Sequence, residues 1–231
     1  MANDSTTHPV GNNRFLQRAY ALSSAAEARD LYNEWASEYD KDLAAEDYAA
    51  PRLAAQALVD AVAHDGVAQQ QQQQRLGGLE ILDAGCGTGL VGVELARLES
   101  RQHVTGLDIS SGMLAVARRT GVYAALEQAD LSHPIAKPDE SFDAVVCVGT
   151  LTRGHVGPQV LEEFVRVVKH GGFIVVTVLD DIWVSAGFSA EVERLRTASA
   201  SMNKIEVLRS EVMGFRSTTN VGGRLLVLRK V

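Results

Sequence analysis

The sequence predicts an α/β fold in which a mostly parallel sheet is covered by helices on both faces. From Leu79 onward, short β-rich runs alternate with amphipathic stretches, the pattern of successive βαβ units. The length of 231 residues suits one domain of this kind. The last two β-rich runs are joined only by the short segment 217–223, which has no room for a crossover helix. The final strand is therefore expected to be antiparallel.

The first 78 residues are expected to contain two helices and two flexible stretches. The first dozen residues are polar, with Gly11-Asn12-Asn13 as a breaker, and we expect a flexible N-terminal segment over 1–22. A helix over 23–43 is indicated by the capping-box spacing of Ser24 and Glu27, with Leu31, Trp35 and Tyr39 recurring on one face. Pro51 fits the first turn of a second helix, which Gly66 would end.

Six consecutive glutamines, Gln69 to Gln74, follow the second helix. Such a tract has no apolar periodicity and cannot contribute to a core, so we interpret 66–78 as a flexible insertion in a surface connection. The remainder, 23–231, is expected to be a single domain. Its strands are expected at 79–85, 103–109, 123–130, 142–149, 171–180, 204–215 and 224–231, with helices at 90–99, 111–120 and 158–170.

Composition and charge exclude several classes of function. The net charge of −7 argues against a broad nucleic-acid-binding face. No window approaches the length of a membrane span, and the N-terminus has neither a basic start nor an apolar run, so a cytosolic location is expected. The two cysteines do not form a metal-binding pattern, and no metal is expected. The oligomeric state stays open.

A glycine-rich turn follows the first expected strand of the sheet. Asp83 ends that strand, and Gly85, Gly87 and Gly89 follow at alternate positions before the chain turns helical. Glycines let the backbone turn sharply and approach a ligand without a Cβ in the way. Open parallel sheets bind ligands at the carboxyl ends of their strands, although a tight turn without a ligand is the alternative.

The spacing of these glycines favours one ligand class over another. A dinucleotide fold uses G-x-G-x-x-G to seat a pyrophosphate on a helix N-terminus, whereas this segment has G-x-G-x-G with Asp83 two positions before it. A carboxylate repels a pyrophosphate and attracts the ammonium group of a methionine moiety.

Two more carboxylates follow later strands. Asp108 can accept hydrogen bonds from both hydroxyls of a ribose, and it can also cap the helix that follows. Asp130 can accept from an adenine amino group while the Leu131 N–H donates to a ring nitrogen; a simple loop aspartate is the alternative. Together with the glycine turn, the two carboxylates predict a nucleoside site.

Taken in order, these motifs resemble those of a known family. The ordered set D-A-G-C-G-T-G, L-D-I-S-x-x-M-L, A-D-L, F-D-A-V-V-C-V-G and G-G-F is similar to class I S-adenosylmethionine-dependent methyltransferases. The runs Y-N-E-W-A-S-E-Y-D-K-D, Y-A-A-P-R-L-A and V-G-T-L-T-R-G-H-V further resemble the Williams–Beuren-syndrome-region methyltransferase-like proteins and their fungal small-molecule relatives. The family implies a Rossmann-like, seven-stranded sheet with an antiparallel C-terminal strand and N-terminal lid helices.

The resemblance also implies roles for particular residues. The turn with Asp83, Gly85, Cys86, Gly87 and Gly89 would line the methionine end of S-adenosylmethionine, and Asp108 would hold the ribose. The adenine would lie near Ile109 and Met113, with Asp130 and Leu131 on its polar edge. Cys147 would lie beside the sulfonium. Tyr39, with Trp35 or Tyr32, would belong to a helix that closes over the cofactor, with core packing as the alternative for Trp35.

The acceptor side is less defined. Methyl transfer from a sulfonium mainly requires the nucleophile to be held in line and water excluded, and a base is needed only for a protonated acceptor. His155 is the best candidate base, because imidazole titrates near neutrality; a surface histidine is the alternative. Asp180 and Asp181 are further candidates, each of which would equally serve as a loop cap.

The leading functional hypothesis is an O- or N-methyltransferase with a small-molecule acceptor. The [DN]-P-P-[YFW] pattern linked with methylation of amide or exocyclic amino nitrogens is absent from the segment after the fourth strand. Peptide or protein methylation is the second hypothesis. A protein that binds S-adenosylmethionine without transferring methyl is the third, and an NAD-dependent oxidoreductase is a distant fourth.

Overall fold

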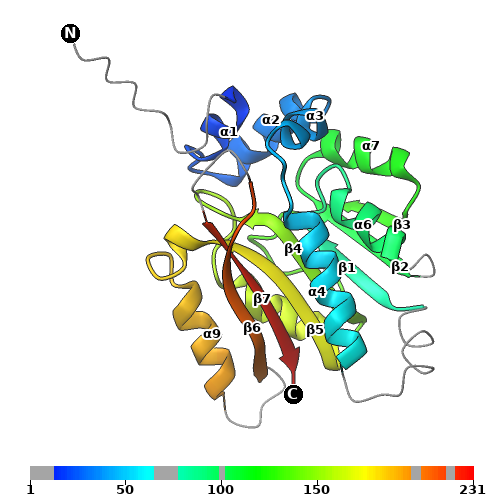
Figure 1. The fold of residues 1–231 in the computed structure, drawn as a ribbon, viewed down its shortest axis with the longest axis vertical. Helices are drawn as coiled ribbons and strands as arrows, with labels where there is room; N and C mark the ends of the chain where they lie inside the picture. The colour runs from blue at the N-terminus through cyan, green and yellow to red at the C-terminus, as the bar shows by residue number, and fades with distance from the viewer. Residues whose placement is uncertain (1–12, 65–77, 99–101, 199–203, 217–221) are drawn as a thin grey trace.

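A computed structural model describes residues 13–64, 78–98, 102–198, 204–216 and 222–231 (Figure 1). The predicted glutamine-rich insertion lies outside these residues, apart from Gly78. The sheet contains β1 (Glu80–Ala84), β2 (His103–Asp108), β3 (Tyr123–Gln128), β4 (Phe142–Leu151), β5 (Val168–Leu179), β6 (Ile205–Gly214) and β7 (Gly222–Lys230). The helices are α1 (Arg14–Ala19), α2 (Ala25–Trp35), α3 (Tyr39–Ala45), α4 (Ala50–His64), α6 (Leu90–Leu98), α7 (Ser111–Thr120), α8 (Val160–Val167) and α9 (Phe188–Thr197), with a 3₁₀ turn, η1 (Asp180–Ile182).

The sheet has the strand order β3-β2-β1-β4-β5-β7-β6. The first five strands pair in parallel, and β7 is antiparallel to both β5 and β6. The predicted fold class and the antiparallel final strand are therefore confirmed. The order reverses between β1 and β4, so this arrangement places a crevice at the carboxyl ends of those two strands.

Two apolar cores enclose the sheet. On one face, Leu58 of α4 and Leu95 of α6 are fully buried in one cluster. On the other face, Phe164 of α8 and Phe188 of α9 belong to a second cluster, and Figure 1 shows these helices on opposite sides of the sheet. Burial of each such side chain contributes roughly 1.5–3 kcal/mol. The sheet is thereby a rigid base for the loops at its upper end.

Local sequence explains several helix ends. The Ser24 hydroxyl accepts from the Glu27 N–H, and the Glu27 carboxylate accepts from the backbone N–H of Ser23, so the predicted cap is present. Ser110 caps α7 by accepting from the Met113 N–H at 3.0 Å. Gly121 ends α7 in the left-handed conformation, with a φ of 70°.

The N-terminal helices α1, α2 and α3 lie together beyond the carboxyl ends of the parallel strands (Figure 1). They share a small core in which Phe15 stacks on Trp35, with ring centroids 5.3 Å apart, and Tyr39 contacts Trp35 edge-on at 4.6 Å. Hydrogen bonds attach them to the sheet loops: Ser110 and the Gly112 N–H donate to Asn33, and Thr88 donates to Asp40. The lid helices expected from the family are thus present.

The structure differs from the sequence prediction in the N-terminal region. Residues 13–22 are not a flexible segment, because α1 is capped by Asn13 and buries Phe15 and Leu16. The helix predicted over 23–43 is broken between Trp35 and Tyr39. The break turns α3 so that the Trp35 indole donates to Asp42 at 2.8 Å.

Two further differences concern the second half of the chain. The helix predicted over 158–170 ends at Val167, because Val168 pairs with Phe142 and begins β5. Helix α9, which was not predicted, covers the sheet face beside α8 and buries Phe188 and Leu195.

Candidate functional site

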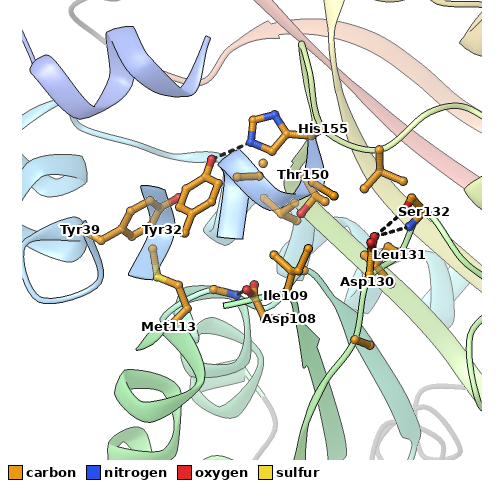
Figure 2. A pocket seen from close by; sticks show the side chains of 18 residues that line it. Tyr32, Tyr39, Asp108, Ile109, Met113, Asp130, Leu131, Ser132, Thr150 and His155 are labelled. Atoms are coloured by element: carbon orange, nitrogen blue, oxygen red, sulfur yellow. Dashed lines mark hydrogen bonds between the residues drawn. The ribbon is translucent and has the colours of Figure 1, made fainter. Parts of the chain in front are cut away.

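A pocket opens where the parallel strands end, and we call it the glycine-loop pocket. It encloses about 710 Å³ of space, including its open mouth. Its floor comes from the segments after β1, β2 and β3 and from the end of β4, and its roof comes from α2, α3 and the segment after β4 (Figure 2). The lining includes Tyr32, Tyr39, Gly85, Gly87, Asp108, Ile109, Met113, Asp130, Leu131, Ser132, Gly149, Thr150 and His155.

The glycine turn reaches the pocket through its backbone. Gly85 and Gly87 have φ angles of 76° and 55°, which favour glycine. A Cβ on Gly85 would lie 2.1 Å from Thr150 Oγ1, so that position has no room for a side chain. A Cβ on Gly87 would meet no atom within 4 Å, so that glycine borders open space. The turn therefore presents bare backbone to a ligand.

Asp108 is the best-placed acceptor in the pocket. Its Oδ2 accepts from the Gly87 N–H and its Oδ1 from the Ser110 N–H, each at 2.8 Å. A carboxylate oxygen has two acceptor sites, so each oxygen retains capacity for a ligand hydroxyl. Burial raises the pKa of Asp108, and these backbone donors oppose the rise. The same contacts tie the glycine turn to the start of α7.

Asp130 lies on another wall of the pocket with Leu131 and Ser132. Its Oδ1 accepts from the Ser132 N–H at 2.9 Å and from the Ser132 hydroxyl at 2.6 Å (Figure 2). Burial favours a higher pKa for Asp130, but the hydrogen bonds from Ser132 outweigh it and lower the pKa. The pocket thus contains two carboxylates, and no lysine or arginine is among the described residues that line it.

The end of β4 carries an irregularity that shapes the pocket. Cys147 pairs with Val176 and Leu151 with Val178, so four positions on β4 span two on β5. Such a bulge re-aims side chains at the end of a strand. Gly149 within it has a φ of 76°, and its N–H donates to Thr177 Oγ1 at 2.9 Å. The bulge places Val148, Gly149 and Thr150 in the wall of the pocket.

His155 and Tyr32 form a hydrogen-bonded pair in the roof (Figure 2). His155 Nδ1 lies 2.7 Å from the Arg153 carbonyl oxygen, which only accepts, so Nδ1 carries the proton. In the neutral ring, Nε2 then accepts from the Tyr32 hydroxyl at 3.0 Å. Burial lowers the pKa of His155 and raises that of Tyr32. Near neutral pH, both the imidazole and the phenol are therefore uncharged.

A second pocket, which we call the tyrosine pocket, adjoins the first. Tyr32, Tyr39 and Gly149 line both. The tyrosine pocket encloses about 620 Å³, including its open part. Its other polar or aromatic walls are Tyr20, Trp35, Tyr48, Thr152, Thr177, Phe215 and Arg216. Two spaces that share a wall of two tyrosines and a glycine suit two ligands that react with each other.

The comparisons with known proteins agree with this geometry. Residues 81–172 match a family model described as a methyltransferase domain, and methyltransferase-like protein 27 of Homo sapiens is 35% identical over 166 residues. This stretch of the chain is therefore similar to methyltransferase domains. The human match covers 70% of this chain and 62% of that protein.

Two further comparisons concern a fungal relative and the fold. A protein of Aspergillus luteorubrus named "Probable methyltransferase ltbC" is 32% identical over 109 residues, or 41% of this chain and 38% of that protein. The chain thus spans less than two thirds of the length of either curated relative. A solved TehB-like S-adenosylmethionine-dependent methyltransferase from Corynebacterium glutamicum has the same fold, with a TM-score of 0.58, 22% identity and coverage of 87% of this chain and 98% of that one. The family expected from the sequence, with its narrower human and fungal resemblance, is confirmed.

Most of the residues predicted to bind cofactor line the glycine-loop pocket. They are Tyr39, Gly85, Gly87, Asp108, Ile109, Met113, Asp130 and Leu131. His155, the candidate base, lines the same pocket. Trp35 is 1% exposed and packs in the core of the lid, and it borders the tyrosine pocket rather than the glycine-loop pocket.

The other predicted residues of the methyltransferase domain lie outside the glycine-loop pocket. Asp83 and Cys147 are fully buried; Asp83 accepts from the Tyr123 hydroxyl at 2.7 Å, and Cys147 packs in the core beneath β4. A Cβ on Gly89 would meet the Tyr123 ring at 3.0 Å, so this glycine makes room for an aromatic side chain. Cys86 borders a smaller pocket behind the glycine turn.

Asp180 and Asp181 also lie outside both pockets. Asp180 pairs with Arg224 at 3.0 Å and Asp181 with Arg153 at 2.6 Å, so both are held in ion pairs beside the tyrosine pocket. In the part of the chain that the structure describes, no group of three or more His, Cys, Asp or Glu side chains is placed to hold a metal ion. The described helices include none that is long and apolar enough to cross a membrane.

Sequence reasoning missed several residues that line the two pockets. Ser132 directly follows the A-D-L motif, and Thr150 directly follows the F-D-A-V-V-C-V-G motif, so extending each motif by one position would have found both. Tyr20, Tyr48 and Arg216 come from three distant segments, and no local pattern connects them. Only the closure of α1 and the C-terminal hairpin over the sheet brings them together.

Proposed function

We propose that the chain is an S-adenosylmethionine-dependent methyltransferase that moves a methyl group to an oxygen or nitrogen atom of a small-molecule acceptor. The observation that carries the proposal is the pair of adjoining pockets with a common wall of Tyr32, Tyr39 and Gly149. The glycine-loop pocket suits a nucleoside donor, and the tyrosine pocket suits an acceptor of small-molecule size.

The residues of the glycine-loop pocket fit the cofactor. Asp108 is placed to accept from the ribose hydroxyls, because it lines the pocket and a carboxylate has about four acceptor sites, of which the Gly87 and Ser110 N–H groups use two. Ile109 and Met113 offer apolar contact for the adenine, and Asp130 offers an acceptor at its edge. The two carboxylates and the lack of lysine or arginine among the described lining residues disfavour a pyrophosphate. This charge pattern supports an adenosyl amino acid over a dinucleotide.

The mechanism assigns separate tasks to the two pockets. When bound, S-adenosylmethionine supplies a methyl group on a positively charged sulfur that leaves as a neutral thioether. Asp108 and the glycine turn fix the donor, and the ring walls of the tyrosine pocket orient the acceptor and exclude water. Such positioning accounts for up to roughly 7–11 kcal/mol of rate acceleration in favourable cases.

His155 and Tyr32 are suited to remove the acceptor proton. Tyr32 lines both pockets and its hydroxyl donates to His155 Nε2. As the acceptor atom bonds to the methyl carbon, its proton passes to the Tyr32 oxygen, and the Tyr32 proton passes to Nε2. The phenol is regenerated and the imidazole ends protonated. Because the pKa of His155 is lowered, its ring is neutral near pH 7 and Nε2 can accept this proton.

A labelling experiment tests the proposal. The protein is incubated with methyl-labelled S-adenosylmethionine and either the small-molecule fraction or the macromolecular fraction of its host cells. We expect label in the small-molecule fraction, and much less of it with Asp108→Asn, which keeps the shape of the side chain but removes its charge. The control Glu206→Gln changes an exposed carboxylate on β6, at the opposite edge of the sheet from β2 and β3, and should label as the wild type does.

Two results would contradict the small-molecule proposal. Label confined to the macromolecular fraction would favour a peptide or protein methyltransferase. Binding of S-adenosylhomocysteine with no label in either fraction would favour a protein that binds the cofactor without transferring methyl.

A further inference from the structure

The tyrosine pocket contains one charged side chain, Arg216, among the described residues that line it. Arg216 follows β6, and its guanidinium lies over the Tyr48 ring at 5.2 Å. Its Nη1 is 3.4 Å from the Tyr20 hydroxyl, and its Nε is buried without a hydrogen-bond partner among the described residues. A guanidinium carries five N–H donors, so most of the donors of Arg216 lack a partner in the described structure.

Arg166 shows what a satisfied, partly buried arginine looks like in the same protein. Its Nε and both terminal nitrogens donate to the carboxylates of Glu163 and Asp139 and to two carbonyl oxygens, at 2.7–3.0 Å. Arg216 makes no ion pair within the described part of the chain. The next five residues in the sequence, 217–221, are S-T-T-N-V and include no acidic residue.

The surroundings of Arg216 set the kind of group that would pair with it. The rest of the described lining is aromatic, aliphatic, hydroxyl-bearing or glycine, with no carboxylate. One positive charge in such a pocket matches one negative charge, and the flat fork of a guanidinium matches a carboxylate in particular. A phosphate dianion would leave charge uncompensated, because the described lining supplies no second cation.

We propose that Arg216 binds a carboxylate of the methyl acceptor, so that the acceptor is an aromatic or apolar carboxylic acid with a separate nucleophilic oxygen or nitrogen. Arg216 lines only the tyrosine pocket, whereas Tyr32, Tyr39 and Gly149 form the border with the glycine-loop pocket. The carboxylate is therefore the anchor, and the nucleophilic atom lies at the border. This inference rests on the proposed function in taking the occupant of the tyrosine pocket to be the acceptor.

Matched pairs of acid and amide test the proposal without knowledge of the acceptor. Phenylacetate and phenylacetamide have nearly the same shape and differ in charge, as do their 4-hydroxy derivatives. Each is titrated by NMR into the full-length protein, with and without saturating S-adenosylhomocysteine. We expect the acids to bind about ten to a hundred times more tightly than the amides, the range for charge-assisted hydrogen bonds in a partly buried site.

Three variants assign the preference to its residue. Arg216→Met removes the charge and should abolish the preference for acids, whereas Arg216→Lys should retain part of it. Arg224→Met is the matched control, because Arg224 lies in the same hairpin and also covers an aromatic ring, but pairs with Asp180. It should keep the wild-type preference. Unchanged S-adenosylhomocysteine affinity in all three would show that they fold.

The outcomes separate this inference from the proposed function. Equal binding of acid and amide to the wild type, including no binding of either, would overturn the role of Arg216. So would a preference that persists in Arg216→Met. Absence of S-adenosylhomocysteine binding, with the acid preference intact in the protein alone, would instead refute the methyltransferase proposal and leave the anion site standing.

Discussion

Replacement of Asp83 by asparagine is expected to change how the stability of the fold depends on pH. The Asp83 side chain is fully buried; one oxygen accepts from the Tyr123 hydroxyl at 2.7 Å, and Oδ1 is buried with no partner among the described residues. Burial raises the pKa of Asp83 to about 7, although the hydrogen bond from Tyr123 opposes the rise. The folded protein therefore holds a proton that the unfolded chain, with an aspartate pKa of about 4, releases.

The sign and size follow from linkage. Because the pKa is higher in the folded state, the stabilising contribution of the protonated group is complete below pH 4 and is lost as the pH rises through about 7. Between pH 5 and 8, the loss occurs over about two pH units, from pH 5 to about 7. At about 1.4 kcal/mol per pH unit, the free energy of unfolding of the wild type falls by about 3 kcal/mol. Asparagine has no proton to lose, so the variant avoids this loss.

Urea unfolding at pH values from 5 to 8 measures the effect. The free energy of unfolding of Asp83→Asn, relative to the wild type, should rise by about 3 kcal/mol over this range. Tyr123→Phe is a useful companion, because it removes the donor that opposes the raised pKa and should extend the loss of stability to higher pH. A difference between Asp83→Asn and wild type that does not vary with pH would refute the reasoning.

Three other predictions concern the turn, the base and the lid. Gly85→Ala should destabilise the fold by more than the roughly 1–2 kcal/mol that left-handed backbone strain costs, because the new Cβ would also clash with Thr150. Gly78 has a φ of 90° and no atom within 4 Å of its would-be Cβ, so Gly78→Ala should show the backbone strain alone. Thermal unfolding measures both. His155→Ala should lower turnover about 10²- to 10⁴-fold without loss of S-adenosylhomocysteine affinity. The wild-type rate should fall only below pH 6.5, since burial lowers the pKa of His155. An unchanged rate in His155→Ala would exclude His155 as the base. Trp35→Ala should cost about 3–5 kcal/mol in chemical unfolding, because Trp35 is 1% exposed at the centre of the lid; a loss below 1 kcal/mol would show that the lid is not packed as described.

The elements predicted correctly are those specified by local sequence. Alternating β-rich and amphipathic runs gave the sheet and its crossover helices, and the short link at 217–223 gave the antiparallel final strand. The glycine turn and Asp108 were found because backbone geometry at the end of a parallel strand demands those residue types. The residues at the end of each strand are therefore recognisable from the few residues next to them in the sequence.

The elements missed depend on contacts between distant segments. Helix α1 is only six residues long, and it is held by packing of Phe15 on Trp35 rather than by helical propensity. The break after Trp35 also depends on packing. The i, i+4 spacing of Trp35 and Tyr39 is compatible with a continuous helix, so local sequence does not reveal the break. Arg216 is recognisable as a site residue only once Tyr20 and Tyr48 are seen beside it.

Calorimetric titration with S-adenosylhomocysteine tests the central claim most directly, namely that the glycine-loop pocket binds an adenosyl amino acid. The account predicts one bound molecule per chain, affinity reduced about ten- to a hundredfold in Asp108→Asn through loss of charge-assisted hydrogen bonds, and no heat with NAD. No binding of S-adenosylhomocysteine by the folded protein, or tighter binding of NAD, would contradict it.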